Sequence, residues 1–470
     1  MTTVDTPGSA PATDWRARRA RYEANPRYRW HVLIVLMVGV FSTAFPTTLL
    51  SASLPDIAHN LGTSTSVITW VQTAPAIAYA IGMPFFGKLG DLHGHRRAFI
   101  YGFACAAVAA LLTACAWNAG SLIVIRTLGQ LAGAATTTAA FGLIATVFAR
   151  EERARAVGIY TSVLAMAPVL AVVAGGPLVE AIGWRTLFLI QAVPAIVAVF
   201  IAIPVLPESA RRRATPFDAA GAIALGIGIT AMLFAVNRGK PWGWSHPIVL
   251  GGFILGPIVL VAFVLIERNR SDPLLPLEFF GRRNFTAPIA TNAIVQLSYI
   301  GGFTIAPFMV SRLFGYRTYK TALIIAIRPV CFSIGAWIAG RYERSIGARS
   351  IQVSSSAVLA AGSVVTAIAA WHESLPLVIV GLAVVGWGVG FGRPANTTAV
   401  TNAVDETDVG LATGVLNMMG QIGSAIGITL LLAIVGDSHD GAVFAHASLV
   451  GAGVAVASIA TAAFVRSAPH

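Results

Sequence analysis

Three arginines lie inside long apolar segments of this sequence: Arg126, Arg328 and Arg393. A charged side chain buried among apolar groups is costly unless a polar partner or a cavity receives it. A guanidinium group binds a carboxylate or a phosphate through two parallel hydrogen bonds. The three arginines are therefore candidates for binding an acid-bearing ligand or for coupling its movement to an ion.

Each arginine also has a structural explanation. Arg126 can extend its side chain toward the polar end of its segment. Arg328 and Arg393 each precede a proline. Because proline frees a backbone carbonyl one turn earlier, the neighbouring arginine can simply bind that carbonyl.

Amide side chains recur at helical spacing in three apolar segments. The pairs are four residues apart, which places their members on one face of a helix: Gln130 after Arg126, Gln296 after Asn292, and Gln421 after Asn417. We expect these amides to contribute to the same binding surface as the arginines. The alternative is that they join neighbouring helices by hydrogen bonds, as amides do in membranes.

Acidic groups are missing from the apolar segments, because all 20 Asp and Glu lie in tails, loops or segment ends. A membrane-embedded transferase would need paired titratable groups or an Asp-rich metal site. We therefore expect no enzyme activity, no metal and no cofactor. Proton exchange usually needs a buried carboxylate or histidine, so coupling to protons stays open.

The composition predicts the elements that position these residues. Of 470 residues, 56% are hydrophobic and 11% charged, and the mean hydropathy is +0.75. A soluble domain carries about 25% charged residues, so this chain is predicted to be a polytopic helical membrane protein. Segments of about 20 residues span a bilayer. Fourteen are expected, at 31–54, 67–88, 98–117, 121–148, 156–179, 186–206, 219–236, 247–266, 285–310, 320–340, 351–371, 375–398, 409–435 and 444–465.

The net charge of +12 comes from short clusters of Arg and Lys between apolar segments. This distribution is the orientation signal of a membrane protein rather than a surface for nucleic acid. With the amino terminus inside, the inner segments hold 23 Arg plus Lys and the outer loops hold 6. We therefore expect a multi-pass protein of the cytoplasmic membrane with both termini in the cytoplasm.

An internal repeat divides the chain. Residues 87–96 follow the second span and residues 340–349 follow the tenth. Glycine, a basic residue, glycine and arginine recur in both at offsets 0, 1, 7 and 9. Two six-helix halves related in this way are a transporter architecture. The expected organisation is a disordered tail (1–30), a first half (31–206), a linker with two extra helices (207–283) and a second half (284–470).

These motifs resemble the major facilitator superfamily. Residues 87–97 resemble its loop signature after the second helix, and Arg126, Gln130 and Gly133 match the Arg-x-x-x-Gln-x-x-Gly of its fourth helix. Trp184-Arg185, residues 217–221, Gly243-Trp244 and residues 267–274 resemble the fourteen-helix drug:H⁺ antiporter branch.

The resemblance implies an all-α fold with 14 transmembrane helices and a monomeric secondary transporter. The expected function is export of amphiphilic small molecules or drugs by alternating access, as in multidrug efflux. The alternative is a carrier of an anionic or lipid-like metabolite without proton antiport. In the loop signature, the expected gating residues are Gly87, Asp91, Gly94, Arg96 and Arg97.

Two features of the branch are not kept in this chain. The branch usually carries an Asp in its first helix, where this chain has Pro46. In the fifth helix its Gly-Pro is replaced by Ala171-Val172, while the following pair survives as Gly175-Gly176. The second motif is associated with antiport.

Overall fold

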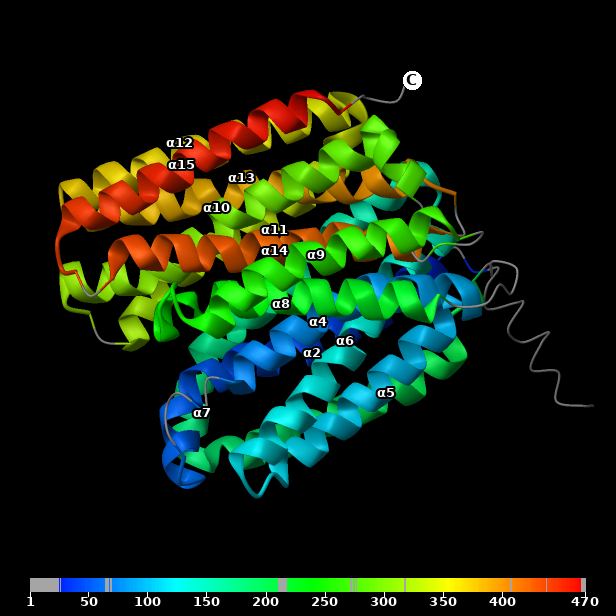
Figure 1. The fold of residues 1–470 in the computed structure, drawn as a ribbon, viewed down its shortest axis with the longest axis horizontal. Helices are drawn as coiled ribbons and strands as arrows, with labels where there is room; N and C mark the ends of the chain where they lie inside the picture. The colour runs from blue at the N-terminus through cyan, green and yellow to red at the C-terminus, as the bar shows by residue number, and fades with distance from the viewer. Residues whose placement is uncertain are drawn as a thin grey trace, which may run out of the picture.

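The chain folds into a bundle of long helices, in which the helices of one part are inclined to those of the other (Figure 1). The computed structural model describes residues 25–465, except for residue 26 and positions 64–66, 68–69, 210–217, 271–272, 274, 276, 317, 406–407 and 437. Most of the expected tail, residues 1–30, therefore lies outside the described residues. The same is true of the side chains of Pro46, Ala171 and Val172.

The expected spans correspond to helices that are mostly longer than the hydrophobic segments alone. The first half, as we use the term, contains α2 (Tyr28–Asn60), α4 (Trp70–His93), α5 (His95–Ala114), α6 (Ala119–Val147) and α7 (Arg150–Val205). Two further helices follow, α8 (Ala219–Trp242) and α9 (Pro247–Arg268), and then the short 3₁₀ helix η1 (Leu277–Gly281). The second half contains α10 (Arg283–Phe314), α11 (Thr318–Ile346), α12 (Ala348–Trp371), α13 (Leu375–Asn402), α14 (Val409–Val435) and α15 (Gly441–Ala463).

Helix α7 contains the expected fifth and sixth spans in one continuous assignment. Gly183 interrupts it with φ 74° and ψ 155°, a conformation that L-residues with a side chain rarely adopt. Counting α7 as two segments, the described residues form fourteen long helical segments, which equals the expected number of spans. Eleven of these are long and apolar enough to span a membrane by length and composition. The chain is thus an all-α, multi-pass membrane protein.

The hydrophobic core follows the two halves. One large cluster is built only from α2, α5, α6 and α7 and the residues that directly follow α6 and α7. Two others lie wholly within the second half. A further cluster joins α8, α9 and η1 to α4, α10 and α14. Figure 1 shows α8 and α9 between α5 on one side and α12 and α15 on the other. The two extra helices therefore cover the seam between the halves.

The internal repeat predicted from the sequence recurs in the backbone. Gly94 directly precedes α5 with φ 96°, and Gly347 directly precedes α12 with φ 82°. Both glycines make the sharp turn between two antiparallel helices, because a positive φ is easily reached only without a side chain. We call the end of the bundle at which α4 ends and α14 begins the Asp91 end.

Candidate functional site

A cavity of about 310 Å³ lies between the two halves. Its walls come from α2, α4, α6 and α7 of the first half and from α10, α13 and α14 of the second. Along α4 the lining begins at Val71, one residue into the helix, and ends at Met83. The cavity therefore extends from the middle of the bundle away from the Asp91 end.

The structure brings seven of the eight predicted binding or coupling residues to this cavity. They come from one helix of the first half and three of the second, and they are Arg126, Gln130, Asn292, Gln296, Arg393, Asn417 and Gln421. The arginines and amides thus form one surface.

Arg393 lies at the centre of the second half's wall. Its Nη1 donates to Asn292 Oδ1 at 2.5 Å, and its Nη2 donates to Asn417 Oδ1 at 2.6 Å. The two amides are themselves fixed, because Asn292 donates to the Leu416 carbonyl and Asn417 to the Thr413 carbonyl, each at 2.8 Å. Both partners of Arg393 are neutral, so its positive charge has no acidic counterpart among the described residues.

The bond from Asn292 to Leu416 joins α10 to α14. Helix joining by amides, the structural alternative for these residues, therefore operates here together with the lining of the cavity. One amide can do both, because its oxygen receives Arg393 while its nitrogen holds the neighbouring helix.

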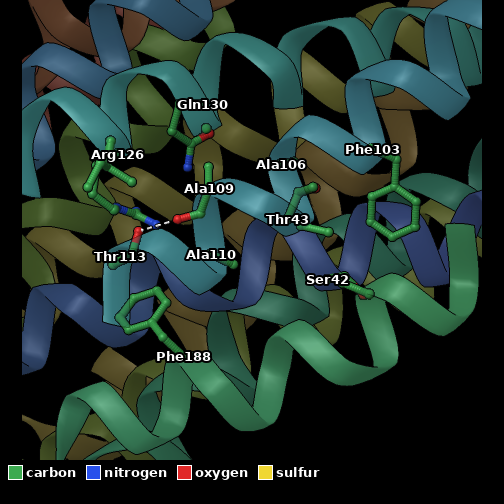
Figure 2. Close-up of a pocket in the computed structure, with 14 residues that line it drawn as sticks. Ser42, Thr43, Phe103, Ala106, Ala109, Ala110, Thr113, Arg126, Gln130 and Phe188 are labelled. Atoms are coloured by element: carbon green, nitrogen blue, oxygen red, sulfur yellow. Dashed lines mark hydrogen bonds between the residues drawn. The ribbon is translucent and has the colours of Figure 1, made fainter. Parts of the chain in front are cut away.

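Arg126 borders the cavity from the first half. It is buried, its Nε has no hydrogen-bond partner, and its guanidinium carbon lies 5.7 Å from the centre of the Phe188 ring. Arg126 also borders a smaller pocket of about 30 Å³ inside the first half. Figure 2 shows it beside Thr113, whose hydroxyl donates to the Ala109 carbonyl at 2.7 Å. No hydrogen bond joins Arg126 to the described part of the chain.

A face of α4 completes the cavity and was not singled out from the sequence. Gln72, Ala76, Tyr79 and Met83 line it at spacings of three and four residues, and the Tyr79 hydroxyl lies 3.0 Å from that of Thr137 on α6. The sequence did contain an indication of this face, because the polar residues Gln72 and Tyr79 lie seven positions apart within the second expected span.

Arg328 is not brought to the cavity. Its Nη2 donates to the Tyr299 carbonyl, and its guanidinium carbon lies 4.1 Å from the centre of the Tyr299 ring. It is 2% exposed and lines a separate pocket of about 30 Å³ inside the second half. The carbonyl that it binds belongs to α10, not to the turn before Pro329.

Beyond the cavity, at the Asp91 end, the Asp91 carboxylate joins the two halves. Asp91 is fully buried and accepts hydrogen bonds from the backbone N–H groups of Gly410 (2.9 Å) and Leu411 (2.8 Å). These groups belong to the first turn of α14, where orphan donors and the helix dipole favour an anion. His95 Nε2 also lies 3.1 Å from Asp91 Oδ1. Asp91 therefore ties the first half to the second.

The other predicted gating residues divide into two groups. A side chain at Gly87 would collide with the Gly410 carbonyl, so this glycine permits the close contact between α4 and α14. Arg96 instead binds the Ile203 carbonyl of α7 and Glu208, which follows α7, and Arg97 is exposed. Only part of the loop signature touches the opposite half.

The repeat provides a second contact between the halves. Gly340, in the last third of α11, packs against the backbone of Ala154 on α7, as Gly87 packs against α14. Ser162 and Ser333 on these helices each donate to the other's carbonyl, at 2.9 and 3.0 Å. Two related helix contacts thus hold the halves together at and near the Asp91 end.

The cavity wall is electropositive. Within the described residues that line it there are two arginines and no Asp, Glu or His. No group of three or more potential metal ligands occurs among the residues that the structure describes. The site can bind and orient a ligand by hydrogen bonds, aromatic contact and charge, and it holds no acid–base pair for catalysis.

Two helical halves that enclose a polar cavity and are joined by separable contacts define a membrane transporter rather than an enzyme. The family model of the Major Facilitator Superfamily matches residues 36–428 and 292–469. The chain belongs to this superfamily, and it therefore carries a small-molecule substrate.

Curated relatives are similar over most of the chain. The cephamycin export protein CmcT of Amycolatopsis lactamdurans is 28% identical over 459 residues, 93% of this chain and 92% of its own. The puromycin resistance protein of Streptomyces alboniger is 29% identical over 416 residues, 87% of this chain and 82% of its own. The multidrug transporter protein MdtP of Bacillus subtilis is 26% identical over 400 residues, 85% and 74% of the two chains.

Solved structures share the fold. The human organic anion transporter MFSD10 has a TM-score of 0.66 at 14% identity, covering 93% of this chain and all of its own. The proton:xylose symporter XylE has a TM-score of 0.65 at 13% identity, covering 93% and 95%. At these identities the likeness concerns the fold alone.

Proposed function

We propose that this chain exports amphiphilic small molecules from the cytoplasm by alternating access. The cavity between the halves carries the proposal, because it combines amide, aromatic and apolar side chains in one space of about 310 Å³. Such mixed linings suit drug-sized ligands. The names of similar transporters, including multidrug, puromycin and cephamycin proteins, support export of this kind.

The Asp91 end is the cytoplasmic end in this proposal. The distribution of basic residues supports it, since 23 Arg plus Lys fall in the inner segments and 6 in the outer loops. The protein then lies in the cytoplasmic membrane, with both termini on the cytoplasmic side. With contacts closed at this end, the conformation described is the outward-facing one.

A substrate that bears an acidic group is favoured within this class. Arg126 faces the cavity without a hydrogen-bond partner in the described chain, and Arg393 meets only neutral amides. A ligand carboxylate would provide the missing counter-charge. Lipophilic cations would be repelled. Substrates of this kind include anionic and lipid-like metabolites.

Proton coupling through a titrating side chain in the cavity is not part of the proposal. The described lining holds no carboxylate or histidine that would change charge near neutral pH. Because one chain supplies both walls of the cavity, a monomer is the proposed transporting unit.

Transport in proteoliposomes tests the proposal. Uptake of carboxyfluorescein, an amphiphilic acid, and of ethidium, a lipophilic cation, is measured with and without an imposed pH gradient. We expect carboxyfluorescein to be moved in preference to ethidium. Strong ethidium transport that an excess of carboxyfluorescein does not reduce would contradict the acid-bearing substrate, and transport of neither would contradict the exporter.

A further inference from the structure

A second, larger hollow lies on the outside of the first half. It measures about 400 Å³ and runs between α4, α5 and α6. Its walls are Phe86 and Leu89 of α4 and Tyr101 and Cys105 of α5. Small residues at the contact of α5 with α6, among them Gly102 packed against the Ala132 carbonyl, leave the space open. We call it the α5 groove.

The α5 groove faces the bilayer. Tyr101 is 68% exposed, Cys105 is also exposed, and the same stripe of α5 continues with Val108 at 53% and Leu112 at 49%. These residues are spaced by three or four along the helix, so they form one apolar face. In a membrane protein such a face contacts lipid chains.

One end of the α5 groove is lined by a positively charged side chain, Arg97. Arg97 lies one turn before Tyr101 on the same face, near the start of α5, and lines the groove with His93. Arg97 is exposed and makes no hydrogen bond or ion pair with any residue in the described ranges. Its neighbour Arg96 differs, because it is engaged by Glu208 and the Ile203 carbonyl. Arg97 therefore has its guanidinium available for an external anion.

We propose that the α5 groove binds one anionic phospholipid, with an acyl chain along Tyr101 and Cys105 and the headgroup phosphate on Arg97. The charge pattern selects this occupant, since an apolar channel capped by a lone guanidinium matches a chain capped by a phosphate. The first turn of α5 adds backbone donors and the positive end of its dipole. This site is separate from the central cavity.

Native mass spectrometry of the delipidated full chain tests the proposal, with dioleoylphosphatidylglycerol and dioleoylphosphatidylcholine as probes. Two variants test the two parts of the site, the charged end and the apolar groove. Arg97→Gln removes the charge, and its control is Arg349→Gln, an exposed arginine at the start of α12 outside the groove. Cys105→Trp fills the groove, and its control is Cys115→Trp, an exposed cysteine at the end of the same helix.

We expect phosphatidylglycerol to bind more tightly than phosphatidylcholine. Arg97→Gln should weaken the binding of phosphatidylglycerol by about fivefold. Cys105→Trp should weaken the binding of both lipids, while the two control variants should bind them as tightly as the wild type does. Equal binding of the two lipids, or equal losses in variants and controls, would overturn the proposal. So would binding of free glycerol phosphate that matches the lipid, because the groove would then contribute nothing. If Cys105→Trp stops transport yet leaves phosphatidylglycerol bound, the groove is a substrate route instead and the proposal fails.

Discussion

Replacing Asp91 by asparagine should shift the transporter away from the conformation in which the Asp91 end is closed. The carboxylate is fully buried and accepts two backbone hydrogen bonds from the first turn of α14. Hydrogen bonds to a charged group contribute about 1.5–3 kcal/mol each, and neutral ones about 0.5–1.5. Asparagine keeps one acceptor and turns an N–H₂ group toward the other donor, so we expect a loss of about 3 kcal/mol from the closed state.

A loss of this size changes the ratio of closed to open conformations by about a hundredfold. Spin labels at His93 and Arg349, exposed residues of the two halves at the Asp91 end, report the opening as a longer distance in pulsed EPR. The labels are placed in a chain without its three native cysteines. Asp405→Asn is the control, because Asp405 is an exposed carboxylate at the same end.

We expect Asp91→Asn to populate the longer distance and to slow transport, while substrate affinity stays within a few fold because Asp91 does not line the cavity. Asp405→Asn should leave the distances and the transport rate unchanged. An unchanged distance distribution in Asp91→Asn, or a collapse of affinity at normal turnover, would refute the reasoning.

Three further predictions test the topology and the arginines. Cysteines introduced at Trp117 and His439, in the loops 117–121 and 436–441, should react with an impermeant maleimide on intact cells, and labelling of the loop 89–95 instead would invert the topology. Arg126→Gln should weaken binding of an acid-bearing substrate by about 10- to 100-fold in a fluorescence titration, with a smaller loss for Arg126→Lys; an equal loss for a neutral analogue would show that the charge is not used. Arg328→Gln should lower the melting temperature by removing the hydrogen bond to the Tyr299 carbonyl, while substrate affinity stays unchanged. A loss of affinity without a loss of stability would show that this residue belongs to the binding site.

The hydrophobic segments were sufficient to predict the fourteen crossings, because the bilayer requires long apolar helices. They were not sufficient to predict where helices end. Helix α4 continues five residues beyond the expected span, to His93, since hydropathy detects the hydrocarbon layer and not the hydrogen-bonded turns outside it. The fifth and sixth spans were expected as separate helices, and only the Gly183 backbone separates them.

The position of the site residues depended on how each helix is rotated. Paired polar residues identify the inward face of α10 and α14, and one amide of each pair, Asn292 and Asn417, binds Arg393. Arg328 has no such companion on its span, so nothing in the sequence determines whether it faces the central cavity or the interior of the second half. The conformational state was equally inaccessible, because one sequence specifies both the closed and the open arrangement of Asp91.

The most direct test of the central claim, that substrate crosses through the cavity between the halves, is to fill that cavity. Ala76 lines it and is exposed to it, so Ala76→Trp occupies the space without displacing a packed side chain. Ala457→Trp, on the exposed face of α15, is the matched control. Carboxyfluorescein uptake into inside-out vesicles should fall to background in Ala76→Trp and stay at the wild-type rate in Ala457→Trp. Wild-type uptake by a correctly folded Ala76→Trp protein would contradict the claim.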